Sequence, residues 1–207
     1  FELNGYGDAT YKNIGYAWET QFDPKPPYIS EINNYTGSYR RTFELPKDWK
    51  GKDVYFHVGS ATSNLTLWVN GKYVGYSEDS KVAAEFNISK YLKPGKNLIA
   101  MQVMRWCDGS YFEDQDFWRF TGIAREVYLY ARPKVHAADI CLDAGLENNY
   151  KDGVLNYHIS LKGGKTDVAI TLCDKDGKQI ATATGAQGSI KVPNVNAWTA
   201  ETPYLYK

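Results

Sequence analysis

Four carboxylates are interleaved with four aromatic rings between Asp108 and Trp118 in the segment RWCDGSYFEDQDFWR, residues 105–119 of this 207-residue chain. We call this segment the acidic loop; its acids are Asp108, Glu113, Asp114 and Asp116, and its rings are Tyr111, Phe112, Phe117 and Trp118. Strands disfavour aspartate and an apolar core excludes unpaired charge, so we expect a loop here. Carboxylates accept strong hydrogen bonds from hydroxyl groups, and aromatic faces pack against C–H groups. A sugar ring has both kinds of surface, so these residue types fit a sugar site.

Three interpretations of the acidic loop compete on composition. In the first, Arg105, Arg119 and Arg125 pair with the acids, and the rings fill one end of a β-sandwich. In the second, the carboxylates bind a hard cation, although one short run seldom supplies a whole coordination shell. In the third, the loop binds a sugar through its carboxylates and its ring faces.

A catalytic role for the carboxylates is a further possibility. A glycosidase needs one carboxylic acid and one carboxylate flanking the scissile bond. Asp114 and Asp116 would point to the same side of an extended chain. A catalytic pair also needs a closed pocket, which a sandwich loop rarely builds unaided, so we expect binding rather than chemistry from this loop.

The elements that must position this loop are strands, because the apolar residues recur with a period of two. In LTLWVNGKYVGY (65–76) the apolar residues alternate, and Asn70-Gly71 predicts a type I′ hairpin turn. REVYLYA (125–131) alternates in the same way, and VLNYHISL (154–161) places Leu155 and Tyr157 on one face. NLIAMQVMRW (97–106) is nearly continuously apolar, which predicts a strand covered on both faces. The first 35 residues are expected to be irregular loop held by aromatic rings.

From about Pro133 the predicted strands are shorter and contain fewer aromatic residues, so we place a domain boundary there. Residues 1–132 suggest a jelly-roll β-sandwich of the galactose-binding type, with about eight strands. Residues 133–207 suggest an immunoglobulin-like β-sandwich, which usually needs about 100 residues and is therefore expected to be incomplete here. The predicted fold class is all-β.

The charge composition limits the classes of partner that the chain is expected to bind. Lys and Arg number 24, Asp and Glu number 24, and no block of like charge occurs, which argues against a nucleic acid or an anionic membrane. No apolar run is long enough for a transmembrane helix, and no signal peptide is recognised. The chain opens at Phe1 without methionine, which leaves room for an upstream segment, so a cytoplasmic or periplasmic location stays open.

The cysteines and one acidic turn give weaker metal signals. Three cysteines without CxxC spacing and three isolated histidines indicate neither a disulfide framework nor a zinc site. DKDGK (174–178) lacks the third acid and the distal glutamate of a calcium loop, so we predict a hairpin turn there. Asn-x-Ser/Thr sequons begin at Asn34, Asn64 and Asn87, and we interpret them as unglycosylated.

The run RWCDGSYFEDQDFWRFTGIAREVYLYARP (105–133) closely resembles the sugar-binding domain of glycoside hydrolase family 2 β-galactosidases. NNYTGSYRRTFELPKDW (33–49) and NVNAWTAETPYLYK (194–207) resemble the same family. The resemblance covers most of residues 33–132 and is weaker over residues 133–190. It implies a jelly roll, an immunoglobulin-like domain and then a (β/α)₈ barrel that carries both catalytic glutamates. This chain is then a fragment without catalytic residues and is not expected to be catalytic alone.

The resemblance also assigns roles to two residues. It implies that Asp116 contacts galactose hydroxyls and helps to hold a sodium ion, and that Asn34 contacts substrate hydroxyls. Family members commonly have proline after the asparagine, where this chain has Tyr35. The rest of the sodium shell and the magnesium site would come from the barrel. Asp108, Glu113 and Asp114 are expected to shape the loop.

The resulting hypothesis is a β-galactosidase fragment that positions the galactosyl group for the barrel. Its expected partners are a β-galactoside, the barrel of the same polypeptide and, in a homo-oligomer, further copies of itself, because an incomplete sandwich exposes a strand edge. The alternatives are a stand-alone carbohydrate-binding module, a family 2 β-glucuronidase or β-mannosidase, and a structural pair of sandwiches.

Overall fold

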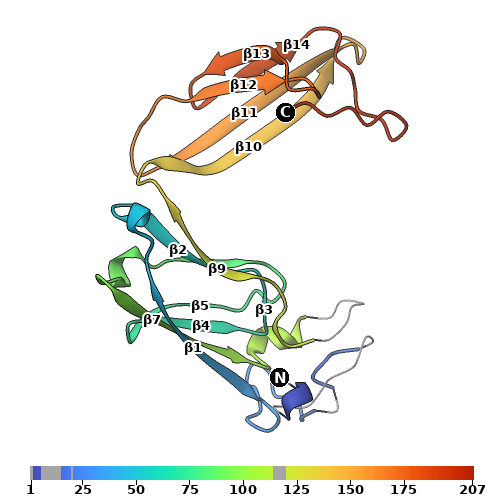
Figure 1. Cartoon of the computed structure of the whole chain (residues 1–207). Coiled ribbons are helices and arrows are strands. Elements are labelled where there is room, and N and C mark those ends of the chain that lie inside the picture. Colours follow the sequence, from blue (N-terminus) through green and yellow to red (C-terminus); the bar gives the residue numbers. More distant parts are fainter. Residues whose placement is uncertain (1, 6–14, 20, 114–119) are drawn as a thin grey trace. The chain divides into compact units, whose positions relative to one another are not determined.

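The computed structural model describes residues 2–5, 15–19, 21–113 and 120–207. The chain divides into two compact units, Phe1–Ala131 and Arg132–Lys207 (Figure 1). The described helices are short 3₁₀ turns: η1 (Glu2–Asn4), η2 (Lys47–Trp49), η3 (Ser89–Tyr91) and η4 (Asp108–Tyr111). Everything else of regular structure in the described residues is antiparallel β-sheet, so the predicted all-β sandwich class is confirmed.

The strands of the first unit form two main sheets and one small one. The strands are β1 (Thr36–Glu44), β2 (Asp53–Val58), β3 (Ala61–Thr62), β4 (Leu65–Val69), β5 (Lys72–Ser77), β6 (Ala84–Asn87), β7 (Lys96–Met104), β8 (Gly122–Ile123) and β9 (Val127–Arg132). One sheet has the order β1-β7-β4-β5 (Figure 1). Another has the order β6-β2-β9, and β3 pairs with β8. The acidic loop therefore lies between β7 and β8, two elements of different sheets.

The core of the first unit is built from alternate residues of these strands. Leu65, Leu67 and Val69 of β4 are at most 1% exposed, and Val54 and Phe56 of β2 are also buried. Further members are Val58, Ala61, Ile88, Ile99 and Val103. Burial of a large apolar side chain of this kind stabilises the fold by about 1.5–3 kcal/mol relative to exposure. The predicted alternation of Leu65, Leu67 and Val69 is confirmed. On β9, Leu129 and Ala131 pack against this core as predicted, whereas Val127 is 38% exposed.

The turn predicted at Asn70-Gly71 joins β4 to β5. Both residues have positive φ, 51° and 78°, as a type I′ turn requires. The Asn70 amide donates to the Tyr91 carbonyl and to Asn97 Oδ1, each at 2.8 Å. Its oxygen accepts from the Leu98 amide at 3.0 Å. Asn70 thus turns the chain and also ties the hairpin to β7.

Strand β7 departs from its prediction. It was expected to be covered on both faces, but Leu98 and Met104 are each 37% exposed, so this prediction is wrong. In the register with β1, these two residues lie opposite Thr42 and Thr36. The neighbouring face of β1 is thus polar and turned to solvent, so the apolar residues beside it are only partly covered.

The second unit contains β10 (His136–Glu147), β11 (Asp152–Lys162), β12 (Ala169–Cys173), β13 (Gln179–Thr184) and β14 (Gln187–Val192). Its sheets have the orders β10-β11-β14 and β12-β13. The core consists of Tyr157, Leu172 and Ile190, and Leu155 packs against it, as the alternation of residues 154–161 predicted. This core is small, and on β10 Ile140, Leu142 and Leu146 remain 58%, 59% and 43% exposed.

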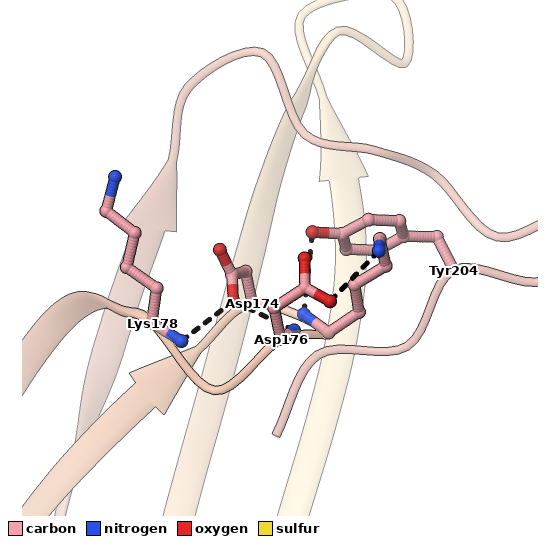
Figure 2. Close-up of polar contacts among 5 residues, drawn as sticks. Asp174, Asp176, Lys178 and Tyr204 are labelled. Atoms are coloured by element: carbon pink, nitrogen blue, oxygen red, sulfur yellow. Dashed lines mark hydrogen bonds and ion pairs between the residues drawn. The ribbon is translucent and has the colours of Figure 1, made fainter.

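The DKDGK segment forms the predicted hairpin turn between β12 and β13. One oxygen of Asp174 accepts from the backbone amides of Asp176 at 3.0 Å and Lys178 at 2.8 Å. The Lys175 ammonium pairs with Asp176 at 3.0 Å. Figure 2 shows these contacts, with the Tyr204 ring beside the turn. The Asp174 carboxylate therefore orders the turn through backbone amides.

Two further properties of the described residues bear on the expectations from sequence. All three cysteines are free thiols: Cys107 is buried, Cys173 is half-buried and Cys141 is exposed. Among the described residues, no helix has the length and apolar character needed to cross a membrane.

Candidate functional site

The central predicted site residue, Asp116, lies outside the described residues, as do Asp114, Phe117 and Trp118. The site is therefore built from the described part of the acidic loop, residues 105–113, and from the segments that pack on it. Those segments are residues 15–35, with residue 20 left out, and residues 76–81.

Asn34 lies directly beside the start of the acidic loop. Its Oδ1 accepts from the Trp106 backbone amide at 2.9 Å, and its Nδ2 donates to the Trp106 carbonyl at 3.2 Å. The Arg105 amide donates to the Tyr35 carbonyl at 2.9 Å. These bonds extend the β1–β7 ladder beyond its last rung, Thr36 opposite Met104. We call the two Asn34–Trp106 bonds the Asn34 clasp.

The Asn34 clasp uses half of the hydrogen-bonding capacity of the side chain. An amide group has two N–H donors and an oxygen with two lone pairs. Within the described residues the clasp takes one donor and one lone pair, so one N–H and one lone pair have no partner among these residues. Asn34 is half-buried, and the structure thus places a polar group with spare capacity where the acidic loop begins.

Tyr111 fastens the N-terminal segment to the acidic loop. Its hydroxyl donates to the Tyr28 carbonyl at 2.7 Å and accepts from the Lys25 amide at 3.1 Å. Its ring meets those of Trp18 and Phe22 edge-on, with centroids 5.4 Å and 6.3 Å away. These contacts agree with the prediction that aromatic rings hold the early irregular segment.

Trp106 is 3% exposed and completes the same aromatic cluster. The Phe22 ring packs edge-on against it at 6.0 Å. The Arg105 guanidinium lies over the rings of Tyr35 and Trp106, 5.7 Å and 5.1 Å from their centroids. Trp106 is thus a packing residue, as expected from its place next to a core strand, and Arg105 adds cation–π contacts to the cluster.

Three described carboxylates gather behind the loop, and sequence reasoning missed one of them. Glu78 follows β5 and accepts a hydrogen bond from the Tyr76 hydroxyl, and one of its carboxylate oxygens lies within 4.8 Å of one of Asp108. Glu113 Oε2 accepts from Ser80 Oγ at 2.9 Å. The sequence signal for Glu78 was the SEDS run at residues 77–80, which lies about 30 residues before Asp108 and offered no reason to join the two.

The electrostatics of this acidic cluster, Glu78, Asp108 and Glu113, favour the protonated form of Glu78. Partial burial raises the pKa of the Glu78 carboxyl, and the hydrogen bond and charge of Asp108 and the charge of Glu113 raise it further. The bond from Tyr76 opposes this rise. Burial also raises the pKa of the Tyr76 hydroxyl, so that group stays protonated and donates.

The same cluster has the donor atoms for a cation. One ligand atom each of Glu78, Cys107 and Asp108 lies within 4.8 Å of the others. Burial raises the pKa of the Cys107 thiol, and the charge of Glu78 adds to the rise, so the thiol stays protonated. Carboxylates suit a hard cation such as sodium, whereas a cysteine sulfur suits softer metals. The described residues of this cluster thus offer two carboxylate ligands, and the predicted sodium ligand Asp116 lies outside them.

Comparison with known proteins shows which family model and which proteins this chain is similar to. Residues 1–133 match the family model of the glycosyl hydrolases family 2, sugar binding domain. The chain is 39% identical over 212 residues to a β-galactosidase of Clostridium acetobutylicum and 37% identical to one of Priestia megaterium. These matches cover 99% and 100% of the chain. The chain spans only 24% and 22% of the lengths of these two relatives.

Solved structures share the fold. A β-glucuronidase of Ruminococcus gnavus superimposes with a TM-score of 0.71 at 24% sequence identity. The match covers 86% of this chain and 33% of the glucuronidase chain. At this level of identity, the likeness concerns the fold alone.

Proposed function

The chain belongs to family 2 of the glycosyl hydrolases, and from that premise we propose that it positions the galactosyl group for a β-galactosidase. The observation that carries the proposal is the Asn34 clasp, because it holds a polar side chain with spare capacity at the start of the acidic loop. The β-galactosidase names of the relatives support the choice of sugar.

The electrostatics of the loop favour a neutral sugar over an acidic one. A glucuronide carries a carboxylate, and the described cluster already holds three acidic side chains, two of which raise the pKa of Glu78 by their charges. A further negative charge nearby would be repelled, which disfavours binding of the wrong substrate. A β-galactoside carries no charge and offers hydroxyl donors, so it is the preferred substrate in this proposal.

Within this proposal, Asp116 accepts hydrogen bonds from the galactose hydroxyls and Asn34 donates its remaining N–H. A sodium ion bound by Asp116 would supply fixed positive charge next to the hydroxyl oxygens. The role of the chain is to fix the ring, and misplacement by about 1 Å can slow a reaction about 10²-fold. The two catalytic carboxylates and a magnesium site are proposed to lie elsewhere in the complete polypeptide, in the part that corresponds to the length of the relatives outside this chain.

Retention is the expected stereochemical outcome, with a covalent glycosyl-enzyme formed on one of those carboxylates. Retaining enzymes hold their two carboxyl groups about 5–5.5 Å apart, on opposite sides of the reacting carbon. One carboxylate oxygen of Glu78 lies within 4.8 Å of one of Asp108, so this pair is closer than that spacing. The described carboxylates thus fit a supporting role.

A substrate panel tests the proposal. The complete polypeptide that contains this chain should hydrolyse nitrophenyl β-galactoside and leave the β-glucuronide and β-mannoside nearly untouched. Preferred cleavage of the glucuronide would keep the family and overturn the substrate.

The second candidate, a stand-alone carbohydrate-binding module, rests on the exposed aromatic rings of the first unit, such as Tyr28 at 78%. Calorimetric titration of the 207-residue chain with galactose discriminates the two. A half-site should give weak binding or none, whereas tight binding would favour the module.

A further inference from the structure

A groove with apolar and polar walls lies beside the Asn34 clasp in the N-terminal segment. Its volume is about 720 Å³. The apolar wall includes Trp18, Phe22, Tyr28 and Ile32, and the polar wall includes Glu19, Gln21, Asp23, Lys25 and Ser30. Ligand pockets for small molecules commonly measure about 300–1,000 Å³ and combine these two kinds of wall.

The segment that lines the groove is attached to the described part of the candidate sugar site by hydrogen bonds and ring contacts. The Asn33 side-chain amide donates to the Gln21 carbonyl at 3.2 Å, and Asn33 immediately precedes the clasp residue Asn34. The Phe22 ring of the groove packs on Trp106, whose backbone the clasp holds. Tyr111 of the acidic loop bonds to the backbone of Lys25 and Tyr28 on the groove wall. Hydrogen bonds and ring contacts thus connect the groove to the Asn34 clasp.

The two most exposed apolar side chains of the groove contribute little to packing among the described residues. Tyr28 is 78% exposed and Ile32 is 71% exposed. The backbone of Tyr28 is fixed independently of its ring, since its amide donates to the Lys25 carbonyl at 2.8 Å and its carbonyl accepts from Tyr111. A flat ring is thus presented to solvent from a well-held backbone, which is the arrangement that suits a stacking platform.

We propose that this groove is the aglycone subsite: it receives the neutral sugar ring linked to the galactosyl group, with Tyr28 as its platform. This inference rests on the proposed function. A hexose has one face of C–H groups, which matches the Tyr28 ring and Ile32, and a rim of hydroxyls, which matches the polar wall. The polar wall carries both acids and a lysine, so it offers hydrogen-bond acceptors and donors to hydroxyl groups.

The test compares two substrates that share galactose and differ in the group linked to its anomeric carbon. The complete polypeptide is assayed with β-1,4-linked galactobiose, whose aglycone is a sugar, and with β-galactosyl fluoride, which has no aglycone ring. Loss of one stacking platform in Tyr28→Ala should lower kcat/KM for galactobiose about tenfold and change that for the fluoride by less than about twofold. Tyr28→Phe keeps the ring and should retain nearly full activity on both substrates.

The control is Tyr150→Ala, which removes a tyrosine of equal exposure, 78%, from a turn of the second unit. It should leave both substrates unaffected. An unchanged ratio of the two kcat/KM values in Tyr28→Ala would overturn the aglycone subsite while leaving the proposed function intact. Wild-type protein that cleaves neither galactoside would overturn both proposals.

Discussion

At the scale of the residue, Asn34 joins two tasks in one side chain. It replaces a rung of backbone ladder by holding both backbone polar groups of Trp106, and among the described residues it retains one N–H and one lone pair. The sequence pointed to Asn34 only through a family resemblance. Its bonding to Trp106 could not be predicted, because it joins positions 72 residues apart.

Replacement of Asn34 by alanine should destabilise the first unit. The Trp106 N–H and C=O would lose their partners, and such a loss typically costs about 1–3 kcal/mol. Urea unfolding measures the change. Asn156→Ala, at an exposed position of β11, is the control and should unfold like wild type. Equal unfolding of the Asn34 variant and wild type would show that the clasp does not contribute to stability.

Glu78 gives a prediction about pH. Its pKa is raised in the folded state, so the folded form binds the proton more tightly than the unfolded form. The corresponding stability is present below the ordinary carboxyl pKa and is lost as the pH rises through the raised value. Glu78→Gln cannot ionise, so it should be more stable than wild type at pH 7. That advantage should vanish near pH 4, close to the ordinary pKa of about 4.3.

Urea unfolding at the two pH values measures the Glu78 effect. Glu44→Gln, an exposed position on β1, serves as the control and should show no such pH-dependent gain. A Glu78→Gln variant that is less stable than wild type at pH 7 would contradict the expectation that the charged Glu78 carboxylate destabilises the fold.

At the scale of the element, period-two alternation accounts for most of what could be predicted. The strand positions, the Asn70-Gly71 turn and the turn at Asp174 were predictable because these features depend on neighbours in the chain. Alternation failed for β7, where the exposure of Leu98 depends on the polar face of β1. The acidic cluster and the groove could not be predicted either, because contacts between distant segments assemble them. Glu78 and Asp108, for example, belong to separate segments.

Tyr111 is the element-scale connector between η4 and the N-terminal segment, and Tyr111→Phe tests it. The ring contacts remain, but the bonds to Tyr28 and Lys25 disappear, at a cost of about 1–2 kcal/mol. Because the Lys25 amide donates to the hydroxyl in the wild type, its hydrogen exchange should become faster in the variant. The Trp106 amide, which is held by Asn34, provides the internal reference. Unchanged exchange at Lys25 would contradict this role.

At the scale of the whole molecule, the second unit leaves apolar surface uncovered. Ile140, Leu142, Ala144 and Leu146 alternate along β10, and Leu142 lies opposite the buried Tyr157 in the register with β11. These residues therefore lie on the face of the sheet that carries the core. Exposed apolar faces and strand edges favour association with another chain.

The 207-residue chain should therefore self-associate weakly at high concentration. Leu142→Lys should reduce this association, because it introduces a charge into a 59% exposed apolar position. Val82→Lys changes a position of similar exposure, 56%, in the first unit and should leave the association unchanged. Sedimentation velocity across a concentration series measures the effect. A clean monomer at high concentration would contradict the prediction.

The central claim is that the acidic loop holds a galactosyl group, and Asp116 is the residue that tests it most directly. The measurement is kcat/KM for nitrophenyl β-galactoside with the complete polypeptide, for wild type, Asp116→Ala and the control Asp176→Ala. Asp176 is an acid of the β12–β13 turn whose side chain is 71% exposed. The account predicts that Asp116→Ala lowers kcat/KM by about 10²-fold or more with an unchanged unfolding transition, while Asp176→Ala behaves as wild type. Near-normal turnover in Asp116→Ala would contradict the account.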